Sequence, residues 1–249
     1  MIKALLSGCC GRMGTVVAKL SVEFGVEIVA GFDIVKKECP FPVYDDILTV
    51  GEIPQVIIDF SNPQTLSPML KFAMQNNIPL VIATTGYSDE QITEINAASN
   101  VVPVFMSANM SLGINLIAQL AKKAAEITGE NFDVEIIEKH HNQKIDAPSG
   151  TAIMLADEVS KSLPYRSEYV YDRQKVREKR SKQEIGIHAV RGGTIVGEHE
   201  IIFAGIDEVI SIRHTAMSRD ILAAGALKAA KYIISKKHGM HNMTDLIME

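Results

Sequence analysis

The sequence predicts an α/β protein with two domains, one built on a doubly wound parallel sheet and a second α+β domain with a mixed or antiparallel sheet. Over the first 111 residues, short apolar runs alternate with segments of helical period, which is typical of parallel strands joined by right-handed crossovers. Beyond residue 131, strand-like runs follow one another with one helical segment between them. We therefore expect residues 1–111 and 219–249 to form the first domain and residues 112–218 the second.

The first strand expected, residues 2–6, leads into a glycine-rich turn, and residues 15–20 then have helical period. Gly8 permits a tight turn, Gly11 lets the backbone approach a pyrophosphate, and Gly14 allows close packing of the helix. A second strand, residues 27–31, ends beside Asp33, about 20 residues beyond the turn, where a carboxylate would bind the adenosine ribose. The spacing is Gly-x-x-Gly-x-x-Gly, not the commoner Gly-x-Gly-x-x-Gly. This arrangement indicates a Rossmann-like domain that binds a dinucleotide, and the alternative is a purely structural turn.

The remaining strands of this domain are expected to end in small and polar residues. We expect strands at residues 55–59, 80–83 and 101–106, separated by helices at about 65–76 and 88–99. Ser88 and Gln91 form a capping box that fixes the start of the second of these helices. In an open parallel sheet, ligands bind at the carboxyl ends of the strands, so residues 59–63, 83–86 and 107–111 are expected to line the cofactor groove. For Thr84 and Thr85, ordinary turn chemistry is the alternative interpretation.

The second domain is expected to open with an apolar helix, residues 112–128, that stops at Gly129. The strands expected after it are residues 132–139, 185–191, 194–204 and 208–213, with an inserted helix at about 152–162. Gly192 and Gly193 predict a hairpin that joins two of these strands. A final alanine-rich helix, at about 219–236, is expected to pack back on the first domain.

Composition excludes several classes of function. The 249 residues are 47% hydrophobic, which is ample for real cores, and the net charge of −5 argues against a nucleic-acid partner. The basic run at residues 173–182 is interleaved with Glu178 and is interpreted as a solvated helix or mobile loop. No apolar stretch approaches the roughly 18 residues needed to span a bilayer. The three cysteines include the neighbours Cys9 and Cys10, a pattern that suits a reducing cytoplasm.

The stretch with the most chemistry is residues 138–151, which holds two adjacent imidazoles, an amine and a helix start. His140 or Lys144 could move a proton, and the Ser-Gly-Thr amides at residues 149–151 form a seat for a carboxylate or phosphate. The alternative without a catalytic role places His140 and His141 on opposite faces of a strand, one packed in the core and the other solvated. A zinc site using Glu138 and His140 is a third reading, but no third ligand follows at a usual spacing, so we expect no metal ion.

Four motifs together carry a resemblance to a known family over nearly the whole chain. They are Gly-x-x-Gly-Arg-Met-Gly at residues 8–14, Ala-Thr-Thr-Gly at 83–86, Asn-Met-Ser-Leu-Gly-Ile-Asn at 109–115, and Glu-x-His-His-x-x-Lys-x-Asp-Ala-Pro-Ser-Gly-Thr-Ala at 138–152. With these, the sequence resembles the 4-hydroxy-tetrahydrodipicolinate reductase (dihydrodipicolinate reductase) family. The resemblance implies a bacterial enzyme of the diaminopimelate route to lysine, which reduces a cyclic dicarboxylate with NADH or NADPH and forms a homotetramer through its second sheet. The cytoplasmic location expected from the cysteines agrees with such an enzyme.

The resemblance also implies roles for individual residues. His140 corresponds to the catalytic acid or base, and Lys144 to a second catalytic residue near the substrate ring and its carboxylate. His141, Gly150 and Thr151 match substrate-binding positions, and the anion seat adds Ser149. The positions that we expect to bind the cofactor are Gly8, Cys9, Cys10, Gly11, Arg12, Met13, Asp33, Ala83, Thr84, Thr85, Ser107, Ala108, Asn109 and Met110.

Two departures from the family pattern concern the cofactor, and two other functions stay open. Ala83 stands where the family often has glycine, and Ile34 stands where an arginine often follows the acidic residue, which puts preference for NADPH in doubt. The alternative functions are another two-domain NAD(P)-dependent reductase of a small acid and a non-catalytic dinucleotide sensor. A sensor that regulates transcription would need a DNA-reading helix or a basic face, and the sequence offers neither.

Overall fold

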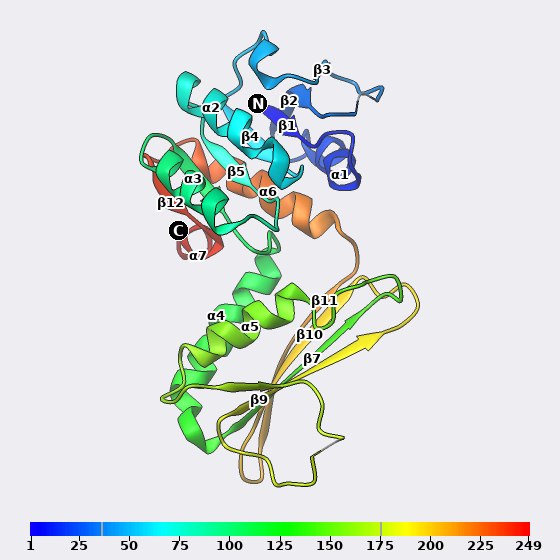
Figure 1. Cartoon of the computed structure of the whole chain (residues 1–249), viewed down its shortest axis with the longest axis vertical. Coiled ribbons are helices and arrows are strands. Elements are labelled where there is room, and N and C mark those ends of the chain that lie inside the picture. The colour runs from blue at the N-terminus through cyan, green and yellow to red at the C-terminus, as the bar shows by residue number, and fades with distance from the viewer. Residues whose placement is uncertain (36, 175) are drawn as a thin grey trace. The chain divides into compact units, whose positions relative to one another are not determined.

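The computed structural model describes residues 1–35, 37–174 and 176–249, and it divides into two compact units (Figure 1). The first unit consists of Met1–Leu112 and Arg219–Glu249, and the second of Gly113–Ser218. The domain boundary expected after residue 111 therefore lies beside the division found between Leu112 and Gly113, and the return to the first unit begins at Arg219 as expected.

A seven-stranded sheet with the order β12-β6-β5-β4-β1-β2-β3 forms the centre of the first unit. Every strand pair in it is parallel. The strands are β1 (Ile2–Ser7), β2 (Val26–Phe32), β3 (Val43–Tyr44), β4 (Val56–Asp59), β5 (Leu80–Ile82), β6 (Pro103–Met106) and β12 (Gly239–His241). The short edge strands β3 and β12 were not expected from the sequence.

Helices cover both faces of this sheet, as Figure 1 shows. They are α1 (Arg12–Leu20), α2 (Leu66–Asn76), α3 (Asp89–Ser99), α6 (Asp220–Ile233) and α7 (Met243–Met248). Neighbouring residues of a strand point to opposite faces, so Leu6 joins the core beneath α1 and α6, and Leu5 joins the core beneath α2 and α3. The α/β fold class with a doubly wound parallel sheet is therefore confirmed.

The helix ends of the first unit agree with the sequence expectation at the start of α3 and differ from it at the end of α6. The capping box of Ser88 and Gln91 is present at the start of α3, as expected. The last long helix, α6, packs within the first unit as expected, but it stops at Ile233 instead of near residue 236. The chain then adds β12 to the sheet edge, and a second capping box, of Asn242 and Asp245, starts α7.

The second unit contains a mixed five-stranded sheet with the order β11-β10-β7-β9-β8. Its core lies between the sheet and the helices α4 (Leu112–Thr128) and α5 (Gly150–Ser160). The strands are β7 (Asp133–His140), β8 (Glu168–Val170), β9 (Glu184–Arg191), β10 (Gly197–Ala204) and β11 (Val209–Ala216). The mixed sheet agrees with the α+β class expected for this unit.

The hairpin predicted at Gly192 and Gly193 is wrong. These glycines connect β9 to β10, but the two strands do not pair, because β7 lies between them, parallel to β9 and antiparallel to β10. The turn instead crosses the end of β7, where the Gly192 amide donates to the carbonyl of His140 and the Asn142 amide donates to Gly193. The antiparallel pair of consecutive strands is β10 with β11.

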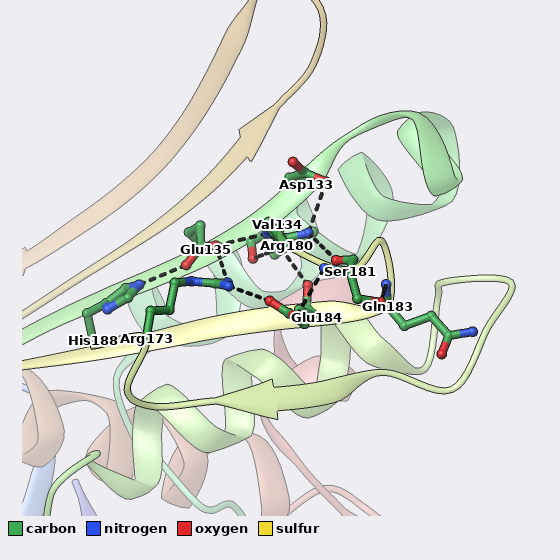
Figure 2. A network of polar contacts seen from close by, with 9 residues as sticks. All are labelled: Asp133, Val134, Glu135, Arg173, Arg180, Ser181, Gln183, Glu184 and His188. Atoms are coloured by element: carbon green, nitrogen blue, oxygen red, sulfur yellow. Dashed lines mark hydrogen bonds and ion pairs between the residues drawn. The ribbon is translucent and has the colours of Figure 1, made fainter. Parts of the chain in front are cut away.

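The basic run at residues 173–182 is not simply solvated. Figure 2 shows Arg173 and Arg180 folded onto carboxylates of β7 and β9. Glu135 Oε1 is 3.0 Å from Arg173 and 3.1 Å from Arg180, and its other oxygen is 2.7 Å from His188. Arg173 also pairs with Glu184. The interpretation of a solvated or mobile segment is therefore wrong for these two arginines, while Lys175 lies outside the described residues.

No helix in the described part of the chain is long and apolar enough to cross a membrane.

Candidate active site

Strand β7 places Glu138 and His140 side by side on its inward face, because residues two apart in a strand point the same way. The Nδ1 atom of His140 is 2.6 Å from Oε2 of Glu138. Glu138 is fully buried and His140 is 9% exposed, so the imidazole closes over the carboxylate and keeps a small opening to solvent. The sequence expectation that these two side chains share a strand face is correct.

Glu138 is held ionised by three neighbours, His140, Ser149 and Arg191. Arg191 binds both of its oxygens, at 2.7 and 2.8 Å, and the Ser149 amide donates to Oε1 at 2.9 Å. Burial by itself would raise the pKa of this carboxyl group, but the hydrogen bonds from Arg191, His140 and Ser149 outweigh it and lower the pKa. Both oxygens are thus engaged by protein donors, which leaves Glu138 poorly placed to act as the zinc ligand considered from the sequence.

Burial and the Glu138 carboxylate together set the protonation state of His140. Burial lowers the pKa of His140, and the hydrogen bond and charge of Glu138 only partly oppose that shift. Near neutral pH the ring is therefore uncharged, with its proton on Nδ1 facing Glu138, and Nε2 carries the lone pair. A Cβ atom at Gly197 would lie 3.1 Å from Nε2, so a larger residue at this position would crowd this nitrogen.

Ser149 is the N-cap of α5, and its polar groups are used inside the protein. Its hydroxyl accepts from the Ala152 amide at 3.2 Å, and its own amide donates to Glu138. The helix begins at Gly150 and not at Ala152 as the sequence pattern indicated, since the cap fixes the start two residues earlier. The first helical residues are consequently Gly150 and Thr151, and a Cβ at Gly150 would meet nothing within 4 Å.

Lys144 and Asp146 lie in the loop between β7 and α5. Lys144 Nζ is 2.8 Å from Asp146 Oδ1, and the same carboxylate accepts a hydrogen bond from the Gly150 amide. The hydrogen bond from Lys144, with help from the backbone, lowers the pKa of Asp146. An ammonium and a helix-start amide therefore both point at one carboxylate, which is the pattern expected of an anion seat. His141 lies just beyond the end of β7 and is half-buried.

Two functional candidates were missed in the sequence. Arg191 ends β9 opposite His140, and His199 lies on β10 opposite Glu138. His199 is 4% exposed, its Nε2 is 3.2 Å from the Ser149 hydroxyl, and its ring meets that of His140 edge-on at 5.2 Å. Burial and the neighbouring His140 lower the pKa of His199 to about 4. The inward alternation of residues 197, 199, 201 and 203 was the available signal for His199.

The glycine-rich turn of the first unit has the conformation its sequence predicts. Gly8 has a φ of +75°, and a Cβ there would lie 2.3 Å from the carbonyl oxygen of Phe60. A Cβ at Gly14 would lie 2.2 Å from the Gly8 carbonyl oxygen, so α1 can approach the turn only with glycine at this position. The turn and the end of β2 together border a cavity of about 300 Å³.

Asp33 lies in the wall of this cavity and is tied to the turn. Its Oδ2 accepts from the Cys10 amide at 2.9 Å and its Oδ1 from the Val35 amide at 3.0 Å, which leaves further lone pairs on both oxygens. Lys37 Nζ donates to the Cys10 carbonyl at 2.9 Å and also borders the cavity, as does Ile34. The size and lining fit one half of a dinucleotide, with the carboxylate where ribose hydroxyls would bind.

Only part of the expected cofactor set surrounds this cavity. Gly8, Cys10, Gly11 and Asp33 line it, together with Ser61 and Asn62 from the loop at residues 59–63 that was expected at the groove. The sequence analysis missed Thr65, which also lines the cavity. The expected residues that do not line it are Cys9, Arg12, Met13, Ala83, Thr84, Thr85, Ser107, Ala108, Asn109 and Met110.

Several of those residues have structural contacts of their own. The side chain of Cys9 is 2% exposed and that of Met110 is 3% exposed, so both pack in the core. The Thr84 hydroxyl accepts from the Ser61 amide at 2.9 Å, in line with the turn chemistry considered as the alternative for this residue.

Comparison with known proteins identifies the family. The family model described as Dihydrodipicolinate reductase, N-terminus, matches residues 2–110, and the one described as Dihydrodipicolinate reductase, C-terminus, matches residues 113–247. The chain belongs to the dihydrodipicolinate reductase family. The N-terminal and C-terminal portions that these two models describe are thus both present, and the resemblance stated from the four sequence motifs is confirmed.

Individual relatives of this dihydrodipicolinate reductase family member agree along its whole length. A 4-hydroxy-tetrahydrodipicolinate reductase of Caldanaerobacter subterraneus subsp. tengcongensis is 52% identical over 99% of this chain and 98% of its own. One of Clostridium novyi is 48% identical with the same coverage. Among solved structures, dipicolinate-bound dihydrodipicolinate reductase from Paenisporosarcina sp. TG-14 matches with a TM-score of 0.76 and 26% identity, over 97% of both chains.

Proposed function

We propose that this protein reduces 4-hydroxy-tetrahydrodipicolinate to tetrahydrodipicolinate with NADH or NADPH, in the formation of diaminopimelate and lysine. The observation that carries the proposal lies in the second unit. Buried Glu138 binds one ring nitrogen of His140, and Lys144 lies in the loop that leads from this pair to the start of α5. The relatives that bear the reductase name match this chain end to end, so the proposal extends to both units.

The chemistry requires a hydride, a proton and the loss of water. Bound NAD(P)H would supply the hydride, and the glycine turn, Asp33 and the cavity beside them are the groups that would hold its adenosine half. We assign the nicotinamide half to residues 83–85 and 107–110, which follow the neighbouring strands β5 and β6.

His140 is the residue that we propose to handle the proton. Glu138 fixes the Nδ1 proton, so Nε2 is the atom that exchanges a proton with the substrate. The ring is uncharged in the free protein, and a bound dicarboxylate would bring negative charge close to it and raise its pKa. His140 could then take up a proton at Nε2 and deliver it to the ring carbon that becomes electron-rich after hydride addition.

Lys144, Gly150 and Thr151 are proposed to bind a substrate carboxylate. The Lys144 ammonium and the Gly150 amide already bind the carboxylate of Asp146, which demonstrates that one carboxylate can satisfy both donors. Ser149 acts through its contacts with Glu138 and α5, because its amide and hydroxyl are engaged there. His141, at the end of β7, is assigned to the second carboxylate.

For the cofactor, we propose use of both NADH and NADPH with a preference for NADH. Asp33 can accept hydrogen bonds from both ribose hydroxyls of NADH but would repel the 2′-phosphate of NADPH. Ile34 supplies no guanidinium, while Lys37 borders the same cavity and provides a point charge. The neighbouring Lys36 lies outside the described residues.

We also propose that the enzyme works in the cytoplasm as a homotetramer assembled through its second sheet. Support for assembly comes from the β10–β11 hairpin, where large apolar side chains are exposed: Ile206 is 89% exposed, Val209 65% and Ile210 40%. Exposed apolar patches of this kind mark protein contacts. Cys9, Cys10 and Cys39 are free thiols, as is usual in a reducing compartment.

The deciding experiment follows NAD(P)H oxidation with 4-hydroxy-tetrahydrodipicolinate generated enzymatically in the cuvette. We expect turnover with this substrate and a loss of about 10²- to 10⁴-fold in kcat for His140→Gln, with cofactor binding retained. A matched control is His188→Gln, a histidine of the same sheet that pairs with Glu135. Absence of turnover in the wild-type protein, or equal loss in the two variants, would refute the proposal.

A further inference from the structure

Three thiols converge in the first unit, and their sulfur atoms have no part in the reaction proposed above. Cys9 and Cys10 belong to the glycine-rich turn, whereas Cys39 comes from the segment between β2 and β3. The Sγ atoms of Cys9 and Cys10 are 3.8 Å apart, and all three Sγ atoms lie within 4.8 Å of one another. None of the three is in a disulfide.

These separations suit a metal ion. Three sulfur atoms this close together lie no more than about 2.6 Å from a common centre, compared with about 2.3 Å for a zinc–thiolate bond. Shifts of a few tenths of an ångström would therefore complete the coordination. Adjacent cysteines alone could not enclose an ion, and the third sulfur arrives from a part of the chain about 30 residues away.

The surroundings supply what such a site needs. Cys9 is 2% and Cys10 8% exposed, so two of the donors are fixed in the core, and Cys39 is half-buried. A divalent ion with three thiolates would carry one net negative charge. The ammonium of Lys37, bound to the Cys10 carbonyl at 2.9 Å, would attract this charge, and the carboxylate of Asp33, bound to the Cys10 amide at 2.9 Å, would oppose it. Cys10 also borders the cavity of about 300 Å³, from which a water could reach a fourth position.

We propose that Cys9, Cys10 and Cys39 form a three-thiolate site for a thiophilic d¹⁰ cation of the Zn²⁺ class, with a water as the fourth ligand. Thiolate sulfur is the donor that soft and borderline cations select, and a set without oxygen ligands disfavours Mg²⁺ and Ca²⁺. The alternative is that three small apolar side chains merely fill space in the core, as free cysteines often do. This inference does not depend on the reductase activity, because it rests on the thiols alone.

The experiment uses the reduced full-length protein and Cd²⁺ as the probe, since cadmium thiolates absorb in the ultraviolet and histidine or carboxylate sites do not. We expect the charge-transfer band to saturate at one Cd²⁺ per chain and to be removed by added Zn²⁺. Cys39→Ser should weaken Cd²⁺ binding by about 100-fold, because ligand number sets affinity. The control Phe41→Leu changes the packing of the same core without removing a sulfur atom and should keep the band.

A second measurement covers the case in which Cys39→Ser folds poorly. In the wild-type protein, Zn²⁺ should protect all three cysteines from alkylation, whereas Mg²⁺ should not. The proposal is overturned if no charge-transfer band appears, if Cys39→Ser binds Cd²⁺ as tightly as the wild type, or if Zn²⁺ leaves the alkylation rate of Cys39 unchanged.

Discussion

Replacing Glu138 with glutamine tests whether the buried carboxylate sets the chemistry of His140. The Ser149 amide needs an acceptor at Oε1, so the carbonyl oxygen of the new amide should take that place and its NH₂ group should face His140 and Arg191. The NH₂ group then donates to Nδ1 of His140, and the imidazole proton moves to Nε2. We expect kcat to fall by about 10²- to 10⁴-fold, the range for a lost general acid or base.

The same change has a cost in stability and a signature in pH. Arg191 loses its hydrogen bond at the Oε2 position, keeps only a neutral acceptor at Oε1 and is left without its buried counter-charge, so we expect the free energy of unfolding to fall by about 3 kcal/mol. Glu138 raises the pKa of His140 against the larger effect of burial, so its removal should lower that pKa further. The decline of kcat/KM with rising pH should then begin at lower pH, because His140 must carry the proton that it delivers.

The matched control is Glu135→Gln, on the same strand but the opposite face. Glu135 also loses charged contacts, to Arg173, Arg180 and His188 (Figure 2), and it does not touch His140. Measurements of kcat and urea titrations of both variants separate the effect on catalysis from the effect on stability. Our account of the site is refuted if Glu138→Gln keeps wild-type kcat while folded, or if Glu135→Gln lowers kcat to the same extent.

Three further predictions concern other parts of the protein. Lys144→Ala should lower kcat/KM for the dicarboxylate by a factor equivalent to about 1.5 to 3 kcal/mol with unchanged NADH affinity, and the reverse pattern in steady-state kinetics and NADH fluorescence would contradict the assignment. The pKa of His199 is about 4 in the folded state and about 6.5 when unfolded, so the free energy of unfolding should be unaffected by this group above pH 6.5 and fall by about 3 kcal/mol towards pH 4. In thermal melts, His199→Gln should lose stability less steeply than the wild type as the pH falls, and an equal loss would argue against a neutral buried ring. Finally, kcat/KM should be at least as high with NADH as with NADPH, and a strong NADPH preference that fades with salt would show that Lys37 outweighs Asp33.

The sequence was informative where the cause of a structure is local. The capping box at Ser88 fixes the start of α3, and the positive φ of Gly8 comes from the turn in which it lies. The pairing of Glu138 with His140 also follows from the two-residue period of a strand. Each of these features depends on residues within a few positions of one another.

The rest depends on which strands become neighbours, and local patterns do not encode this. Gly192 and Gly193 do turn the chain, but the sequence could not indicate that β7 would occupy the place between β9 and β10. Arg191 and His199 were missed for the same reason, because only the register of β9 and β10 against β7 brings them beside the Glu138–His140 pair. Short edge strands such as β12 are set by the neighbour they extend and have too few residues to show a period.

The salt bridge between Lys144 and Asp146 means that the proposed anion seat is occupied by the protein's own carboxylate before any substrate arrives. Substrate binding at this seat would be an exchange of one carboxylate for another, so the measured affinity reports a difference between two similar interactions. Asp146 is 58% exposed at its side chain and can swing into water when it is displaced. Such an exchange would keep Lys144 charged and oriented at all times, and it would let the dicarboxylate product leave by the same substitution in reverse.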